Sequence, residues 1–227
     1  MSEEIKKFKI TIDGQTTEVA PGTTILNAAR QIGGKSVPPA MCYYSKLENS
    51  GGRCRTCLVE VSKGSEADPR PMPKLVASCR TTVMDGMEVK NLTSEKTQEA
   101  RKAVTEFLLL NHPLDCPICD QAGECHLQDL GYEHGNQMTR TDFERNTYEA
   151  DDLGPNIKLN MNRCILCARC VLVANQLTDQ RDHGILFRGE KAEISTYLNK
   201  AITNDFSGNV IDVCPVGALT DKTFRFS

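Results

Sequence analysis

Apolar and polar residues alternate near the N-terminus in the way that half-buried strands require. Residues 8–12 carry apolar side chains at every second position, which predicts a strand. Asp13-Gly14 follows directly and predicts a hairpin turn into a return strand over residues 16–19. Further strands are predicted at 58–61, 75–77 and 87–89.

A short helix is predicted between these strands. Pro21-Gly22 interrupts the chain, and Thr23 or Thr24 can cap a helix that runs to Ile32 and ends at Gly33-Gly34. The stretch 62–73 is rich in proline, charge and small residues, which predicts a surface loop. The order of hairpin, helix and later strands predicts an α+β sheet crossed by one helix.

Helical periodicity replaces the alternation in the next part of the chain. Ser94 can cap a helix that runs to about Leu110 with an apolar stripe, and Asn111-His112-Pro113 ends it. Residues 135–154 are polar and aperiodic and are expected to form a connector. Three further helices are predicted near 125–130, 167–177 and 194–202.

Charge and composition narrow the function classes. The chain has 227 residues, a net charge of −3 and a pI near 5.9, without the basic stripe of a nucleic-acid-binding protein. No apolar run approaches the roughly 20 residues that a membrane helix needs. The acidic N-terminus does not resemble a signal peptide. The protein is therefore expected to be soluble, or peripheral on a larger assembly.

Cysteine content is the outlier. The chain has eleven Cys, an odd number that cannot pair completely, and no secretion signal, so disulfides are disfavoured. There is no Trp, and a hydrophobic content of 39% predicts a thin core. Metal ligation is the better interpretation. Together with one histidine, the cysteines divide into three sets of four ligands.

The first set has three cysteines on one glycine-containing loop and a fourth beyond a predicted strand. Eleven residues separate Cys42 from Cys54, and two separate Cys54 from Cys57, whereas Cys79 returns after a predicted strand. Gly51-Gly52 allows the backbone to wrap closely around an inorganic core, so the set predicts a 2Fe–2S cluster. The spacing differs from the C-x4-C-x2-C of plant-type ferredoxins, and a zinc site remains the alternative.

The second set consists of His112, Cys116, Cys119 and Cys125, with the pattern H-x3-C-x2-C-x5-C. Pro117 separates the cysteines of the C-x2-C pair, and Gly123 provides a turn before Cys125. By itself His112 could simply end the preceding helix, but three cysteines need a fourth ligand and the two roles are compatible. Neutral imidazole in place of a thiolate removes a negative charge and should raise the reduction potential.

The third set consists of Cys164, Cys167, Cys170 and Cys214. The run C-x2-C-x2-C is a strong signal for a 4Fe–4S cluster, because three sulfurs on one loop can reach three corners of a cubane. The fourth ligand, in Cys214-Pro215, is 43 residues further on, so the run implies one cluster rather than two. A zinc site is a poor alternative at this spacing.

Other polar residues carry weaker signals. His126, His134 and His183 lack ligand spacing to the three sets and are interpreted as surface or core residues. The carboxylates of Asp115, Asp120 and Glu124 lie near the second set and could tune its reduction potential, but they are interpreted as solvated. With every cysteine assigned, no nucleophile and base remain for catalysis, and there is no dinucleotide fingerprint.

Three segments resemble the large iron–sulfur (G) subunit of respiratory complex I, NADH:quinone oxidoreductase. Residues 111–125 resemble its loop with one histidine and three cysteine ligands, residues 207–220 its last cubane ligand, and residues 50–61 its 2Fe–2S loop. The resemblance implies an α+β chain with a β-grasp ferredoxin-like domain at 5–90 and a histidine-ligated 4Fe–4S domain at 91–134. A connector at 135–154 and a 4Fe–4S ferredoxin-like domain at 155–227 would follow.

The resemblance also implies a function. The chain would hold one 2Fe–2S and two 4Fe–4S clusters and carry electrons from a flavin subunit that oxidises NADH toward quinone. Its partners would be the flavin subunit and further iron–sulfur and membrane subunits. It would lie peripherally on the cytoplasmic side of a bacterial inner membrane, with no membrane span and no nucleic-acid partner.

The sequence departs from the family at several points. The step from Cys57 to Cys79 is long, which suggests an insertion at 62–73, and Leu166 and Leu172 stand where a polar or basic residue is expected. The chain ends 13 residues after Cys214, where the family continues into a large molybdopterin-enzyme-like domain, so a natural short form, a split subunit and a truncation all stay open.

Two other functions remain as alternatives. The diaphorase iron–sulfur subunit of NAD-reducing hydrogenases has a similar short layout, and the corresponding subunit of a formate dehydrogenase is included in this alternative. A zinc-stapled interaction module is the alternative of another class.

Overall fold

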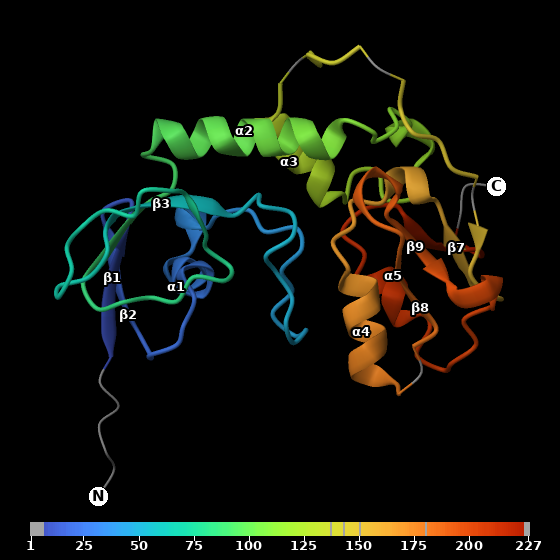
Figure 1. The fold of residues 1–227 in the computed structure, drawn as a ribbon, viewed down its shortest axis with the longest axis horizontal. Coiled ribbons are helices and arrows are strands. Elements are labelled where there is room, and N and C mark those ends of the chain that lie inside the picture. Colours follow the sequence, from blue (N-terminus) through green and yellow to red (C-terminus); the bar gives the residue numbers. More distant parts are fainter. Residues whose placement is uncertain (1–6, 137, 143, 150, 180, 225–227) are drawn as a thin grey trace, which may run out of the picture. The chain divides into compact units, whose positions relative to one another are not determined.

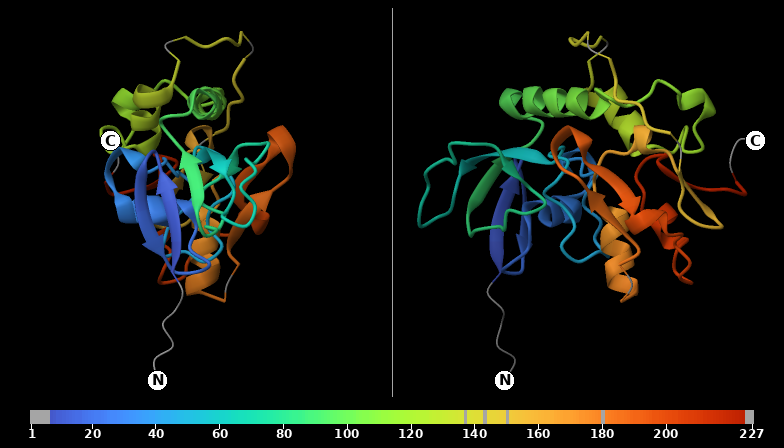
Figure 2. Two further views of the ribbon diagram at one scale, coloured as in Figure 1. Left: turned by 90° about the vertical axis from the view of Figure 1, so that its left-hand side faces the viewer. Right: turned by 45° about the vertical axis from the view of Figure 1, so that its right-hand side comes forward.

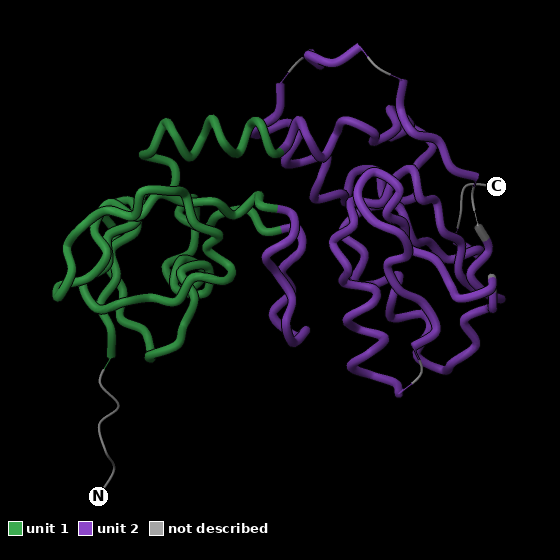
Figure 3. The backbone as a smooth tube through the Cα atoms, in the orientation of Figure 1, with its two compact units in different colours: residues 1–40, 55–104 green, residues 41–54, 105–227 purple. Residues whose placement is uncertain are grey.

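The chain divides into two compact units. The computed structural model describes residues 7–136, 138–142, 144–149, 151–179 and 181–224. Unit 1 consists of residues 1–40 and 55–104, and unit 2 of residues 41–54 and 105–227 (Figure 3). The loop 41–54, which interrupts unit 1 in sequence, therefore belongs to unit 2. The domain boundaries at 5–90, 91–134, 135–154 and 155–227 stay a prediction.

A five-stranded sheet forms the framework of unit 1 (Figure 1). Its strands lie in the order β2-β1-β5-β3-β4, and β1 pairs with β5 in parallel while the other pairs are antiparallel. The strands are β1 (Phe8–Ile12), β2 (Gln15–Val19), β3 (Leu58–Lys63), β4 (Val76–Ala77) and β5 (Met87–Lys90). Both the predicted hairpin and the three later strands are confirmed.

Helix α1 (Ile25–Ile32) crosses this sheet, as the sequence predicted. Of the two candidate caps, Thr24 is the one used: its side chain accepts a hydrogen bond from the backbone N–H of Asn27 at 3.3 Å. Gly33 follows the helix with a φ of 81°, a conformation that glycine adopts without steric cost. The predicted α+β arrangement of a sheet crossed by one helix is thus confirmed.

The core of unit 1 is purely apolar. Figure 2 shows the strands and α1 that supply it from two further directions. No cysteine belongs to it among the described residues. The buried members of this core are Ile10, Ile12, Val19, Ile25, Ala28, Ala29, Val59, Val61, Val83, Met87 and Val89.

Helix α2 (Glu95–Leu109) begins in unit 1 and ends in unit 2. The Oγ of Ser94 accepts a hydrogen bond from the N–H of Thr97 at 3.2 Å, which confirms the predicted cap. In the part of the chain that the structure describes, no helix is both long and apolar enough to cross a bilayer.

Unit 2 combines short helices with two small sheets. Strands β10-β7-β6 form one sheet and β8-β9 the other, all antiparallel. The helices are α3 (His126–His134), α4 (Arg169–Leu177) and α5 (Asn209–Asp212). The strands are β6 (Asp151–Asp152), β7 (Ile157–Leu159), β8 (His183–Leu186), β9 (Glu193–Thr196) and β10 (Leu219–Asp221).

The helix predicted at 194–202 is wrong. Glu193–Thr196 is strand β9, whose Ile194 and Thr196 are buried on one face while it pairs with β8. A single 3₁₀ turn, Tyr197–Asn199, follows, and Leu198 has a φ of 53°, which no helix can continue through. Period-2 burial, rather than helical period, was the correct signal. The polar connector 135–154 likewise ends in a strand, β6.

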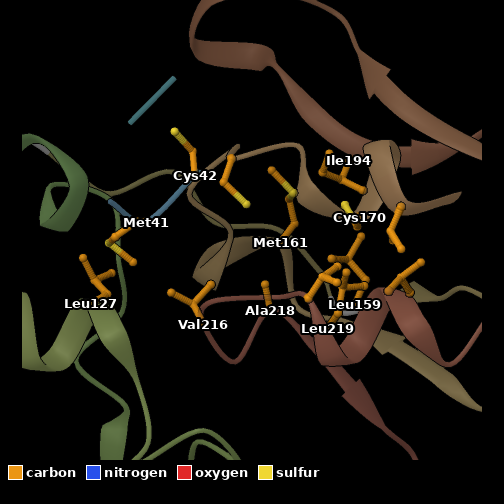
Figure 4. Packing of buried hydrophobic residues seen from close by; sticks show 14 of the residues in the cluster. Met41, Cys42, Leu127, Leu159, Met161, Cys170, Ile194, Val216, Ala218 and Leu219 are labelled. Carbon is orange, nitrogen blue, oxygen red and sulfur yellow. The ribbon is translucent and has the colours of Figure 1, made fainter. Parts of the chain in front are cut away.

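The core of unit 2 contains cysteines among its apolar side chains. Figure 4 shows Cys42 and Cys170 with members of this cluster from segments far apart in sequence, including Met41, Leu159 and Val216. Five of its fully buried members are candidate ligands, namely Cys42, Cys54, Cys125, Cys167 and Cys170. Candidate ligands from all three sets therefore belong to this core, although Cys116 of the second set is exposed.

Candidate iron–sulfur sites

The first ligand set is divided between the two units. In unit 2, the Sγ of Cys42 accepts hydrogen bonds from the N–H groups of Arg53 at 3.3 Å and Cys54 at 3.4 Å. The Sγ of Cys54 accepts one from the N–H of Cys42 at 3.4 Å. In unit 1, the sulfurs of Cys57 and Cys79 lie 3.3 Å apart. Each pair is buried, and donors aimed at sulfur are typical of cluster ligands.

The backbone around this set is shaped for close approach. Gly51 and Gly52 have φ values of 97° and 80°, as the wrapping of the loop requires. Arg55, which is not a glycine, has a φ of 62°, a strained conformation of the kind that concentrates at functional sites. In unit 1, Arg101 is 1% exposed and donates from Nε to the carbonyl of Thr56 at 3.3 Å, which fixes the residue before Cys57.

The second ligand set lies on the loop between α2 and α3. Helix α2 ends at Leu109, and the N–H of His112 bonds the carbonyl of Leu109 at 3.1 Å in the turn that follows. Cys116 begins a 3₁₀ turn, and Gly123, with a φ of 84°, makes the turn before Cys125. The N–H of Ala122 bonds the carbonyl of Cys119 at 3.0 Å, which closes the loop on itself.

His112 has the properties of a metal ligand. Its Nδ1 is buried and has no hydrogen-bond partner among the described residues. A buried polar atom of this kind is costly unless a further group binds it. Burial lowers the pKa of His112, which favours the neutral imidazole that ligation requires. An iron of a cluster would satisfy this nitrogen, so the residues present fit the group.

The third ligand set surrounds a cavity. This small cavity is lined by apolar side chains and by all four cysteines of the set, Cys164, Cys167, Cys170 and Cys214. Leu166 and Ala168 hold φ values of 52° and 60°, so the C-x2-C-x2-C run bends repeatedly through the left-handed region. A sulfur-lined, otherwise apolar cavity fits a cubane well.

Burial makes these thiols poor acids when no iron is bound. It raises the pKa of Cys164 to about 12 and that of Cys167 to about 11, and it raises those of Cys125, Cys170 and Cys214 as well. Backbone N–H groups partly offset this, for example that of Leu166, which donates to the Sγ of Cys164 at 3.3 Å. Thiolates at these positions therefore need the positive charge of iron.

The second and third sets are tied together by residues that the sequence analysis missed or misinterpreted. Arg163 donates from Nη2 to Oδ2 of Asp115 at 2.6 Å and from Nη1 to the carbonyl of Gly217 at 3.5 Å. Asp115, expected to be solvated, is thus in an ion pair. A Cβ at Gly217 would overlap the Sγ of Cys119, so this glycine permits contact between the two loops. An arginine directly before Cys164 was the available sequence signal.

The remaining histidines hold the places expected for surface and core residues. His126 is exposed, His134 is half-buried at the end of α3, and His183 is buried. Both ring nitrogens of His183 also lack a hydrogen-bond partner among the described residues, so the case for His112 as a ligand rests on its place in the cysteine loop as well as on its buried Nδ1. In the described ranges, no three His, Cys, Asp or Glu side chains are arranged to hold a single metal ion.

Three family models match successive parts of the chain. Residues 6–94 match a 2Fe-2S iron-sulfur cluster binding domain, and residues 101–140 match an NADH-ubiquinone oxidoreductase-G iron-sulfur binding region. Residues 154–220 match the ferredoxin-like domain of NADH-quinone oxidoreductase subunit 3. The fold and the three ligand sets thus define an iron–sulfur protein with a 2Fe–2S domain and 4Fe–4S-binding regions.

Curated relatives identify the family. The chain is 46% identical over 216 residues to the NADH-ubiquinone oxidoreductase 75 kDa subunit of Reclinomonas americana, covering 95% of this chain and 30% of the relative. It is 43% identical over 219 residues to the G-type NADH-quinone oxidoreductase subunit of Rickettsia bellii, covering 96% and 30%. The chain belongs to the family of the 75 kDa, or G-type, subunit of complex I and corresponds to its N-terminal region. It spans about 30% of the length of these relatives.

A solved structure shares the fold. The crystal structure of NAD⁺-reducing NiFe-hydrogenase in the H2-reduced state contains a chain that matches with a TM-score of 0.82 and 28% identity, covering 97% of this chain and 89% of that one. The predicted relation to hydrogenase diaphorase subunits is therefore confirmed at the level of structure.

Proposed function

We propose that this chain is the electron-relay segment of an NADH:quinone oxidoreductase, carrying electrons from a flavin subunit that oxidises NADH toward quinone. The observation that carries the proposal is the buried cavity lined by the four cysteines of the third set. Its support is the match of successive parts of the chain to iron–sulfur family models. In the whole complex this transfer would be coupled to proton translocation by other subunits.

The proposed cofactors are one 2Fe–2S and two 4Fe–4S clusters, which supply one-electron redox chemistry when bound. The ligands would be Cys42, Cys54, Cys57 and Cys79 for the first, His112, Cys116, Cys119 and Cys125 for the second, and Cys164, Cys167, Cys170 and Cys214 for the third. The chain's own contribution is to hold these ligands, exclude water and direct hydrogen-bond donors at sulfur.

Contacts within unit 2 support the third site as the middle member of the relay. Its loop reaches the second set through the Arg163–Asp115 pair and the close approach of Gly217 to Cys119. It reaches the loop of the first set through Arg169, which donates from Nη2 to the carbonyl of Tyr43 at 2.7 Å. Short paths of bonded and contacting atoms favour electron transfer between neighbouring sites.

The proposed partners are the flavin subunit and the further iron–sulfur and membrane subunits of a complex I. The proposed place is the cytoplasmic face of a bacterial inner membrane, held peripherally. Support comes from the identity of 43% with the Rickettsia bellii subunit and of 46% with the mitochondrial protein of Solanum tuberosum named NADH dehydrogenase (ubiquinone) iron-sulfur protein 1.

A hydrogenase diaphorase is the second candidate, favoured by the TM-score of 0.82. Purification with native partners, followed by mass spectrometry, separates the two. We expect the membrane subunits of complex I in the preparation. A nickel–iron hydrogenase subunit in their place would overturn the complex I assignment.

The variant His112→Cys tests the second ligand set. A fourth thiolate adds negative charge to the cluster, so the cluster should persist and its reduction potential should fall. The measurement is a redox titration followed by EPR, with His126→Cys as the control because His126 is exposed. An unchanged or raised potential in His112→Cys would contradict the role of His112 as a ligand.

A further inference from the structure

Two buried arginines stand directly before cysteines of the third set. Arg163 precedes Cys164 and is 6% exposed, and Arg169 precedes Cys170 and is 5% exposed. A guanidinium stays protonated in proteins, so each carries a charge into the interior. A buried charge requires compensation by hydrogen bonds and by opposite charge. The two arginines find that compensation in different ways.

Arg163 is compensated by a carboxylate. Its Nη2 and Nε both donate to Oδ2 of Asp115, at 2.6 and 3.1 Å, and the Asp115 side chain is only 25% exposed. The charge of Arg163 is thus largely balanced inside the pair. The ion pair connects the loop of the second set to the loop of the third set.

Arg169 connects the loops of two ligand sets. Its Nη2 donates to the carbonyl of Tyr43, the residue after Cys42, at 2.7 Å, and its guanidinium carbon lies 5.5 Å from the centre of the Tyr44 ring. In the chain Arg169 itself lies between Cys167 and Cys170 of the third set. One buried cation therefore belongs to the loop of the third set and is bonded to the loop of the first set.

We propose that the buried positive charge of Arg169 raises the reduction potentials of two clusters, the third-set cluster and the cluster bound by Cys42 and Cys54. This inference rests on the proposed function, since it needs clusters at both sites. Reduction adds a negative charge to a cluster, and a nearby buried cation stabilises that charge more than it would in water. Because the same cation acts on both sites, loss of its charge should lower both potentials together.

The test compares four variants by redox titration with EPR detection. Arg169→Gln removes the charge and Arg169→Lys keeps it, whereas Arg163→Gln removes the paired arginine. Arg188→Gln removes an exposed arginine of unit 2 as the matched control. Arg169→Gln should shift the reduced-to-oxidised ratio of both clusters about tenfold toward oxidised at a fixed potential, or about 59 mV for one electron.

The other variants test whether the effect depends on the charge and the position of Arg169. Arg169→Lys should stay near wild type, the second-set cluster should keep its potential in both Arg169 variants, and Arg188→Gln should shift nothing. Arg163→Gln should shift the third-set cluster less than Arg169→Gln does. Unchanged potentials in Arg169→Gln, or a shift in only one of the two clusters, would overturn the proposal.

Iron and acid-labile sulfide analysis of each variant distinguishes a failure of the proposed function from a failure of the proposed role of Arg169. A wild-type chain without clusters would refute the proposed function, whereas intact clusters with unshifted potentials refute only the role of Arg169. If Arg169→Gln does not assemble clusters, Arg169→Lys decides alone. Potentials near wild type then support the role of charge, and a tenfold shift despite the retained charge contradicts it.

Discussion

The two units bury their cores by different means. Unit 1 closes an apolar core of alternating strand residues around α1, without a cysteine in the described part of that cluster. Unit 2 has short helices and two small sheets, and five candidate ligands lie inside its core. Burial of apolar surface can account for the first unit, whereas the second should depend on its clusters for a fixed structure.

Removal of iron should have the largest effect of the changes considered, and it should act on unit 2 rather than on unit 1. Chelation of the reduced protein should abolish fixed structure in unit 2, because six buried thiols and His112 would lose their partners. Unit 1 should keep its sheet. Hydrogen exchange read by mass spectrometry should show lost protection in β7 and α4, with protection retained in β1 and β3.

Equal loss of protection in both units would show that the sheet also depends on the clusters, and the comparison would fail. Reconstitution with iron and sulfide should restore protection in unit 2, which serves as the control for irreversible damage.

Truncation in the core of unit 1 should have the next largest effect. Ile12 is 0% exposed, and Ile12→Ala should lower the free energy of unfolding by about 2–5 kcal/mol through lost burial and a cavity. Urea denaturation followed by circular dichroism measures it. Glu18→Ala, on the exposed side of β2, should change stability by no more than about 0.5 kcal/mol. The EPR signals of the second and third clusters should persist in Ile12→Ala, and their loss would contradict independent cores.

Breaking the Arg163–Asp115 ion pair should lower the free energy of unfolding by less than Ile12→Ala does. Asp115→Asn leaves the buried Arg163 without its carboxylate, so the free energy of unfolding should fall by about 1–3 kcal/mol. Asp205→Asn is the control, since Asp205 is exposed. Denaturant unfolding monitored by the visible absorbance of the clusters follows unit 2 selectively. Equal stability of Asp115→Asn and Asp205→Asn would contradict a stabilising ion pair between Arg163 and Asp115.

The cap of α1 should give the smallest effect. Thr24→Ala removes the acceptor for the N–H of Asn27 and should cost about 1 kcal/mol. Thr23→Ala is the matched control one residue earlier. Thermal unfolding of both variants tests which threonine caps the helix, and a larger loss in Thr23→Ala would contradict the structure.

The same contrast explains what the sequence predicted. In unit 1, alternation over residues 8–12, the Asp13-Gly14 turn and the α1 cap are local signals, and local signals decide strands and helix ends. In unit 2, β6, β7 and β10 have two or three residues each and exist through pairing between distant segments, which no short window contains. The interval 194–202 shows the error directly, because cross-strand pairing with β8 outweighs helical propensity there.

The candidate ligands were predictable from spacing, but their surroundings were not. The buried Nδ1 of His112, the ion pair of Asp115 and the contact of Gly217 with Cys119 arise from contacts between residues far apart in sequence. Arg163 and Arg169 are visible in the sequence as arginines before cysteines. Their different partners appear only once the loops are placed in unit 2.

Iron and acid-labile sulfide content, measured on anaerobically purified protein together with EPR of its reduced form, tests the central claim most directly. Three clusters predict about ten iron atoms and about ten sulfides per chain, with EPR signals from both 2Fe–2S and 4Fe–4S centres. A colourless protein with stoichiometric zinc and no sulfide would contradict the account and establish a zinc-stapled module instead.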